Sequence, residues 1–124
     1  MAETVYIVDD DDAVRDSLKG LLESQSYGVE AFASGSEFLK RHTRDFAGCL
    51  VLDVNLPELD GFEILARLGP PRAEFPVVMI TAQGNPAIES RALEAGATAF
   101  IGKPFAAAAF LALIRKALER RSGE

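Results

Sequence analysis

The apolar run from Cys49 to Leu52 constrains the fold of this chain more than any other stretch. A short run of consecutive apolar residues is typical of a strand that is buried on both faces. Such a strand needs neighbouring strands beside it and a layer of other elements above and below it. Asp53 follows the run directly, and Pro57 and Gly61 then turn the chain. Because a carboxylate at the exit of a buried strand is poorly placed for stability, Asp53 is the first candidate for a functional residue.

The rest of the chain alternates short apolar runs with segments of helical periodicity. We predict strands at residues 5–8, 29–32, 49–52, 75–80 and 99–101. A helix is expected after each strand; the first is indicated by apolar residues at helical spacing, namely Val14, Leu18, Leu21 and Leu22. Asp11 or Asp12 is expected to cap it, and Pro86 to stand in the first turn of the fourth helix. Five strands that each precede a helix imply a parallel sheet with right-handed crossovers and helices on both faces.

Composition narrows the class of protein. The 124 residues suit a single domain, residues 1–124, and 48% hydrophobic residues are enough for a core. A net charge of −6 argues against a nucleic-acid surface on this domain. One cysteine and one histidine exclude an internal disulfide and a zinc site of the usual kind. With no cationic and apolar leader and no apolar run near 18 residues, we expect a cytoplasmic domain that does not enter a membrane.

Polar residues follow four of the five predicted strands. The site of a parallel sheet lies outside the carboxyl ends of its strands, and there the sequence places Asp9, Asp10, Asp53, Thr81 and Lys103. Taken singly, each has a bland explanation, because acids cap helices, a threonine often ends a strand and a lysine is usually on the surface. Taken together at one sheet edge, with complementary charges, they predict a functional site.

The predicted cluster of carboxylates indicates a metal and a phosphoryl ligand. Two carboxylates about 5 Å apart repel by roughly 3 kcal/mol at an effective dielectric near 20. A fold tolerates this repulsion if a cation relieves it or if a pKa rises. Removal of one charge, as in Asp10→Asn, is therefore expected to stabilise the metal-free fold. Oxygen ligands without histidine or cysteine suit Mg²⁺ or Mn²⁺, and Mg²⁺ shares its remaining positions with water and phosphate.

The same residues suggest how a phosphoryl group would be handled. Lys103 offers a point charge and Thr81 a hydroxyl donor, both suited to phosphoryl oxygens. A carboxylate can accept a phosphoryl group as an acyl phosphate, and Asp53 is the best placed nucleophile.

At this point the sequence resembles the receiver domain of two-component response regulators, and most closely the FixJ-type branch. The resemblance covers essentially the whole chain. It is carried by the paired acids Asp9 and Asp10, the Leu-Asp-Val-Asn-Leu-Pro segment around Asp53, Ile-Thr-Ala at 80–82 and Phe-Ile-Gly-Lys-Pro-Phe at 100–105. It implies a flavodoxin-like (βα)5 domain with strand order 2-1-3-4-5, and a regulatory switch rather than a metabolic enzyme.

The resemblance also implies roles for single residues. Asp53 would be phosphorylated by a sensor histidine kinase or a histidine phosphotransfer protein. Asp10 and Asp53 would bind Mg²⁺ through their side chains, with the backbone carbonyl of Asn55, and Asp9 would act through water. Thr81 would move to the phosphoryl group and Lys103 would pair with it. Phe100 would be the aromatic switch, and the Lys103–Pro104 bond is often cis in this family.

Phosphorylation would then change a surface made of the fourth helix, the fifth strand and the fifth helix. A homodimer through this surface would use an apolar contact of Leu93, Phe100 and Ile101. Without an output domain in these residues, the receiver would signal by protein contact or through a domain beyond Glu124, for which a helix-turn-helix is the first expectation by analogy.

Three other functions are compatible with parts of the pattern. A haloacid-dehalogenase-like phosphatase also uses an aspartate after a buried strand, but Asn55 stands where it carries a second one. A flavin carrier of the same fold would need a phosphate loop rich in serine, threonine and glycine after the first strand. A degenerate receiver that only binds partners would not need the complete set of acids, threonine and lysine.

Overall fold

The computed structural model describes residues 3–41, 48–68, 76–82 and 85–122. Strands and helices alternate along the chain in ten elements, with these bounds: β1 (Thr4–Val8), α1 (Asp12–Glu23), β2 (Gly28–Phe32), α2 (Gly35–Arg41), β3 (Cys49–Asp53), α3 (Gly61–Leu68), β4 (Val77–Thr81), α4 (Pro86–Glu94), β5 (Ala99–Gly102) and α5 (Ala107–Ser122). The predicted alternation is confirmed.

The strands form one parallel sheet in the order β2-β1-β3-β4-β5. In the register of the central strands, Val8 lies beside Leu52 and Asp53 beside Ile80. From β1 the chain continues to β2 on one side, and it then crosses to β3 on the other side of β1. The carboxyl ends of β1 and β3 therefore flank the switch point of the sheet. This topology, predicted from the resemblance, brings the acids of two separate strands together.

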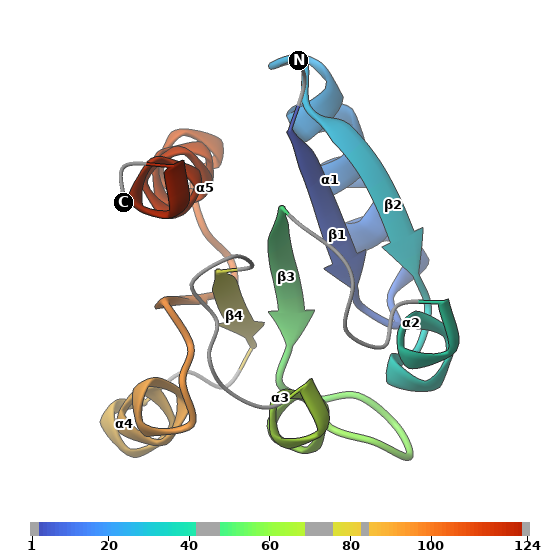
Figure 1. The fold of residues 1–124 in the computed structure, drawn as a ribbon, viewed down its shortest axis with the longest axis vertical. Coiled ribbons are helices and arrows are strands. Elements are labelled where there is room, and N and C mark those ends of the chain that lie inside the picture. Colours follow the sequence, from blue (N-terminus) through green and yellow to red (C-terminus); the bar gives the residue numbers. More distant parts are fainter. Residues whose placement is uncertain (1–2, 42–47, 69–75, 83–84, 123–124) are drawn as a thin grey trace.

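Helices cover both faces of the sheet, as Figure 1 shows. Apolar residues of β1, β3 and β4 alternate between two clusters because successive side chains point to opposite faces. One cluster packs against α2, α3 and α4, where Phe38, Phe62 and Leu65 are buried. The other packs against α1 and α5, where Leu22, Phe110 and Ile114 are buried. Complete burial of β3 and β4 follows from this three-layer arrangement.

Side-chain caps explain where several helices begin. The carboxylate of Asp11 accepts from two backbone N–H groups in the first turn of α1, so Asp11, one of the two predicted caps, is the one used. Asn85 caps α4, with Pro86 in its first turn as predicted. Before α3, Asp60 and Glu63 exchange hydrogen bonds of 2.8 and 2.9 Å as a capping box.

The boundaries differ from the predicted ones in small ways. The spacing of apolar residues predicted that Phe105 belongs to the last helix, but Phe105 precedes α5 and stacks on Phe110 with ring centroids 5.3 Å apart. β4 is described from Val77, and Phe75, where we predicted that the strand begins, lies outside the described residues. Across the described ranges, no helix has both the length and the apolar character needed to cross a membrane.

Candidate functional site

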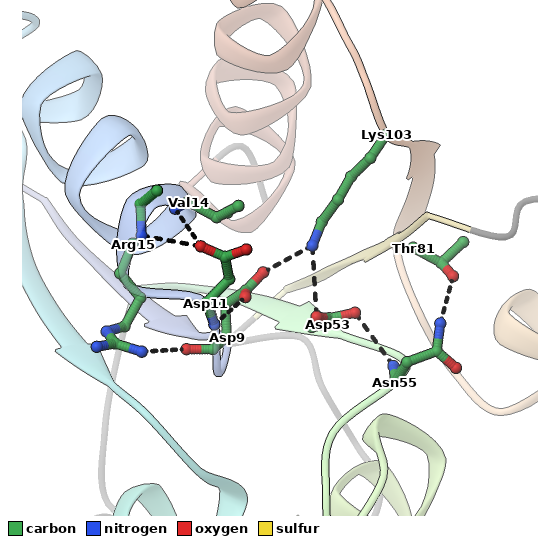
Figure 2. A network of polar contacts seen from close by, with 9 residues as sticks. Asp9, Asp11, Val14, Arg15, Asp53, Asn55, Thr81 and Lys103 are labelled. Carbon is green, nitrogen blue, oxygen red and sulfur yellow. Dashed lines mark hydrogen bonds and ion pairs between the residues drawn. The ribbon is translucent and has the colours of Figure 1, made fainter.

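The carboxyl ends of four neighbouring strands bring together the polar residues that the sequence singled out. Asp9 and Asp10 follow β1, while Asp53 and Thr81 are the last residues of β3 and β4. Lys103 follows β5, and its backbone N–H donates to the carbonyl of Thr81 at 2.7 Å. All five residues therefore lie at one edge of the sheet, and Figure 2 shows the side chains of Asp9, Asp53, Thr81 and Lys103 there.

Three carboxylates converge at this edge. Asp9, Asp10 and Asp53 each place an oxygen within 4.8 Å of the others. Asp9 is fully buried and Asp53 is only 4% exposed, whereas Asp10 is exposed. Two nearly buried carboxylates this close need a compensating charge.

Lys103 supplies that charge. Its Nζ lies 3.0 Å from Oδ2 of Asp9 and 3.4 Å from Oδ2 of Asp53, so the ammonium bridges the two buried acids (Figure 2). Burial by itself would lower the pKa of Lys103, but the hydrogen bond with Asp9 and the charge of Asp53 outweigh burial and raise it. The lysine therefore remains a cation and forms ion pairs with both buried acids.

The compensation is incomplete at Asp53. Burial, and next the charge of Asp9, raise the pKa of Asp53 to about 6. The backbone N–H of Asn55 donates to Asp53 at 3.1 Å, and this bond together with Lys103 opposes the rise. The carboxylate of Asp53 is thus less stabilised than an ordinary one, which a cation or a covalent partner would relieve.

The structure shows where the repulsion predicted for this cluster is strongest. The charge of Asp9 raises the pKa of Asp53, and both of these acids are buried. Asp10 is exposed, so water screens its carboxylate more than theirs. The gain in stability expected from Asp10→Asn stays a prediction, and removal of the charge of Asp53 is expected to have the larger effect.

Asn55 does more in this site than the sequence suggested. Only its backbone carbonyl was proposed as a ligand, yet its side-chain Nδ2 donates to Oγ1 of Thr81 at 3.0 Å (Figure 2). Thr81 is 1% exposed, and Asn55 lies over it at the surface. A polar residue two positions after the central acid was the only signal for this contact. Asn55 thereby joins the loop after β3 to the end of β4.

A glycine allows α3 to approach the end of β3. A Cβ atom on Gly61 would lie 2.6 Å from the backbone oxygen of Asp53. The N–H of Gly61 donates to the carbonyl of Val54 at 2.9 Å. The start of α3 therefore lies directly against the end of β3 and the loop that carries Asn55.

Two further expectations concern β5 and the residues after it. Phe100 lies half-buried on β5, beside Met79 of β4, and packs on the cluster that faces α3 and α4. The Lys103–Pro104 peptide bond is cis, as the resemblance suggested.

A mostly apolar groove of about 640 Å³ lies next to Lys103, between α1 and the segment after β5. Its lining includes Val14, Leu18, Pro104 and Phe105.

The donor set fits a hard divalent cation. Among the described residues, the metal-ligating side chains that converge here are three carboxylates, with no histidine or thiol among them, and the backbone carbonyl of Asn55 follows two positions after Asp53. Such oxygen sets suit Mg²⁺, which is usually held by one or two carboxylates and otherwise by water and phosphate. The exposed side chain of Asp10 leaves one side of the cluster accessible to a ligand.

Comparisons with known proteins agree with this geometry. Residues 5–115 match the family model described as the response regulator receiver domain. The chain is 38% identical over 118 residues to the response regulator protein TodT of Pseudomonas putida, covering 95% of this chain and 52% of that protein. It is 37% identical over 116 residues to the transcriptional regulatory protein FixJ of Bradyrhizobium diazoefficiens, covering 94% of this chain and 57% of that protein. The chain thus spans about half the length of these curated relatives.

Solved structures have the same fold. A CheY-like response regulator receiver domain protein from Methanospirillum hungatei is 31% identical and superposes with a TM-score of 0.91, over 99% of this chain and 98% of that one.

Proposed function

Because the chain belongs to the family of response regulator receiver domains, we propose that Asp53 is the residue on which its phosphorylation-dependent switch operates. Receiver domains are regulatory switches rather than metabolic enzymes, and histidine kinases phosphorylate them. The observation that carries the proposal is the position of Asp53, which ends a fully buried strand, has a pKa raised to about 6 and lies 3.4 Å from Nζ of Lys103.

In the proposed reaction, an oxygen of the Asp53 carboxylate attacks the phosphorus of a phosphohistidine on a sensor kinase or a phosphotransfer protein. A bond forms between oxygen and phosphorus, and the phosphorus–nitrogen bond breaks. The electron pair stays on the imidazole nitrogen, which takes up a proton. The product is an acyl phosphate on Asp53. Only the ionised carboxylate is a nucleophile, so its raised pKa favours reaction above pH 6.

The neighbouring residues would each act on the incoming phosphoryl group. Lys103, already 3.4 Å from Asp53, would pair with a phosphoryl oxygen. Thr81 would exchange its contact with Asn55 for one with the phosphoryl group. Asp10, Asp53 and the carbonyl of Asn55 would hold Mg²⁺ or Mn²⁺, with Asp9 acting through water. When bound, this cation would supply positive charge to the phosphoryl oxygens.

The groove beside Lys103 supports the proposed histidine-bearing partner. It is lined by apolar residues of α1, by Pro104 and by Lys103, whose Nζ lies 3.4 Å from Asp53, so a partner that covers the groove would lie beside the acid. The proposed output lies on α4, β5 and α5. Leu93 is 49% exposed on α4, and Phe100 and Ile101 are half-buried on β5, which supports an apolar homodimer contact or a contact with an output domain.

Intact-mass measurement tests the proposal. Wild type, Asp53→Ala and the matched exposed control Asp16→Ala are incubated with acetyl phosphate and Mg²⁺. We expect one added phosphoryl group in wild type and in Asp16→Ala, none in Asp53→Ala, and none in any variant when EDTA removes the metal. An adduct on Asp53→Ala would contradict the assignment.

Rapid hydrolysis could hide the adduct, so a second measurement accompanies the first. Beryllofluoride and Mg²⁺ are added to the wild type, and the backbone amide signals are followed by NMR. We expect the signals of Thr81, Phe100 and Lys103 to move. If no adduct forms and these signals stay in place, the chain is a passive binding module.

A further inference from the structure

We infer that Arg15, on the first helix, positions the loop that carries Asp9 and Asp10 and thereby sets the affinity of the acidic cluster for a divalent cation. This inference rests on the proposed function, because it concerns the same site. Arg15 is not among the site residues that the sequence and the resemblance predicted.

The guanidinium of Arg15 holds the loop by its backbone. Its Nη1 donates to the carbonyl oxygen of Asp9 at 2.8 Å, as Figure 2 shows. Its Nη2 pairs with the carboxylate of Asp12 one turn earlier in the helix. The Arg15 side chain is only 18% exposed, whereas Asp12 is 86% exposed. The better buried of the two contacts is thus the one with Asp9.

The other polar groups of Asp9 are also held. Its N–H donates to the carbonyl of Phe32 on β2 at 3.2 Å, and its carboxylate accepts from the N–H of Asp11 at 2.9 Å. Arg15 supplies the remaining contact, to the carbonyl. Because the peptide unit is planar, an anchored Asp9 carbonyl also fixes the N–H and Cα of Asp10.

Asp10 depends on this anchoring more than its neighbours do. Its carboxylate has no hydrogen bond or ion pair with any residue in the described part of the chain, and it is exposed. Asp9 and Asp53, by contrast, are held by Lys103. The direction of the Asp10 carboxylate toward the cluster therefore comes from the backbone, which Arg15 holds before Asp10 through the Asp9 carbonyl and the Asp9 carboxylate holds after Asp10 through the Asp11 N–H.

Loss of the charge of Arg15 and loss of its positioning role would change the affinity for Mg²⁺ in opposite directions. A cation beside a cluster of acids repels a second cation, so loss of charge alone would tighten Mg²⁺ binding. Loss of positioning would weaken it, and residues that orient metal ligands typically change affinity about 10-fold or more. The sign of the change therefore separates the two effects.

The experiment is a titration of the metal-free chain with Mg²⁺, followed by the amide NMR signals of Asp10 and Asp53. The variants are Arg15→Gln, which removes the charge, and Arg15→Lys, which keeps the charge but loses the planar fork. Asp12→Asn is the matched control, because it removes the ion pair and leaves the contact with Asp9. We expect the Kd for Mg²⁺ to rise about 10-fold in both Arg15 variants and to stay within about twofold of wild type in Asp12→Asn.

A second readout separates positioning from damage to the fold. The Mg²⁺ concentration that gives half-maximal phosphorylation by acetyl phosphate is expected to rise with the Kd, while the rate at saturating Mg²⁺ stays at the wild-type value. Should Arg15→Gln not fold, Arg15→Lys alone decides between the outcomes, since it retains the charge.

Equal or tighter Mg²⁺ binding in the Arg15 variants would overturn the inference while leaving the proposed function intact. An equal loss of affinity in Asp12→Asn would assign the effect to the ion pair and would overturn it as well. A wild type that binds no Mg²⁺ and takes up no phosphoryl group would overturn the proposed function itself, and the inference with it.

Discussion

The carboxyl ends of β3 and β4 and the segment formed by α4 and β5 are packed in very different ways. Every residue of β3 and β4 is buried. All four residues of β5 are only half-buried, and in α4 the single buried residue is Ala92. β5 lies at the edge of the sheet, so part of this difference follows from topology. Asp53 and Thr81 therefore lie on fully buried strands, whereas two of the three elements of the proposed output, α4 and β5, have little buried surface to hold them in place.

This comparison explains how a small chemical change could move a surface. Thr81 ends a rigid strand, yet it lies at the start of the connection to α4. Movement of its hydroxyl would displace an element that has few buried contacts, whereas β3 would resist the same force. A packed element that has two discrete arrangements can amplify such a small displacement.

The largest expected effect compares the same truncation in the two regions. Leu52 in β3 is fully buried and Leu93 in α4 is 49% exposed. We expect Leu52→Ala to lower the free energy of unfolding by about 2–5 kcal/mol, and Leu93→Ala to change it by less than about 0.5 kcal/mol. Urea unfolding at constant pH measures both. Similar losses in the two variants would show that α4 is anchored as firmly as the central strand.

The second prediction concerns how the buried acid Asp53, at the carboxyl end of β3, lowers the free energy of unfolding. The pKa of Asp53 is raised from 3.8 to about 6, so the folded state binds this proton more tightly than the unfolded state. The stabilisation that comes from the raised pKa of Asp53 is present below pH 3.8 and is lost as the pH rises through 6. In EDTA at pH 8, Asp53→Asn is expected to be more stable than wild type by about 1–3 kcal/mol.

Most of that difference is expected to disappear at pH 4, where urea unfolding is repeated. The exposed acid Asp16 provides the control, because Asp16→Asn should show no such dependence on pH. An Asp53→Asn variant that is no more stable than wild type at pH 8 would show that Lys103 compensates both buried acids completely.

The smallest expected effect concerns the attachment of α4. The guanidinium of Arg91 lies 3.9 Å from the ring centroid of Phe62 on α3, a cation–π contact between the two helices. We expect Arg91→Gln to lower the free energy of unfolding by about 0.5–1 kcal/mol and to speed amide exchange in α4 more than in β3. Arg67→Gln, on the exposed face of α3, is the matched control. A double-mutant cycle with Phe62→Leu isolates the pair, and a coupling energy of zero would contradict it.

The sequence by itself determined the fold class, the alternation of strands and helices and the residues at the strand ends. These features depend on local patterns, such as the apolar run before Asp53 or the periodicity after Asp11. The resemblance added the strand order, and the structure has that order. Parallel strands must then bring their carboxyl ends to one edge, which is why the sequence was enough to group Asp9, Asp10, Asp53, Thr81 and Lys103.

Only the tertiary structure decided which of these groups touch. Lys103 reaches Asp9 across 94 positions of the chain, and Asn55 reaches Thr81 across 26. Such contacts depend on the crossovers and the packing of helices, which place a side chain to within an ångström, and no local pattern carries that information. For the same reason the sequence did not distinguish the buried pair Asp9 and Asp53 from the exposed Asp10, and no pattern in it predicted the contact between Arg15 and the loop that it holds.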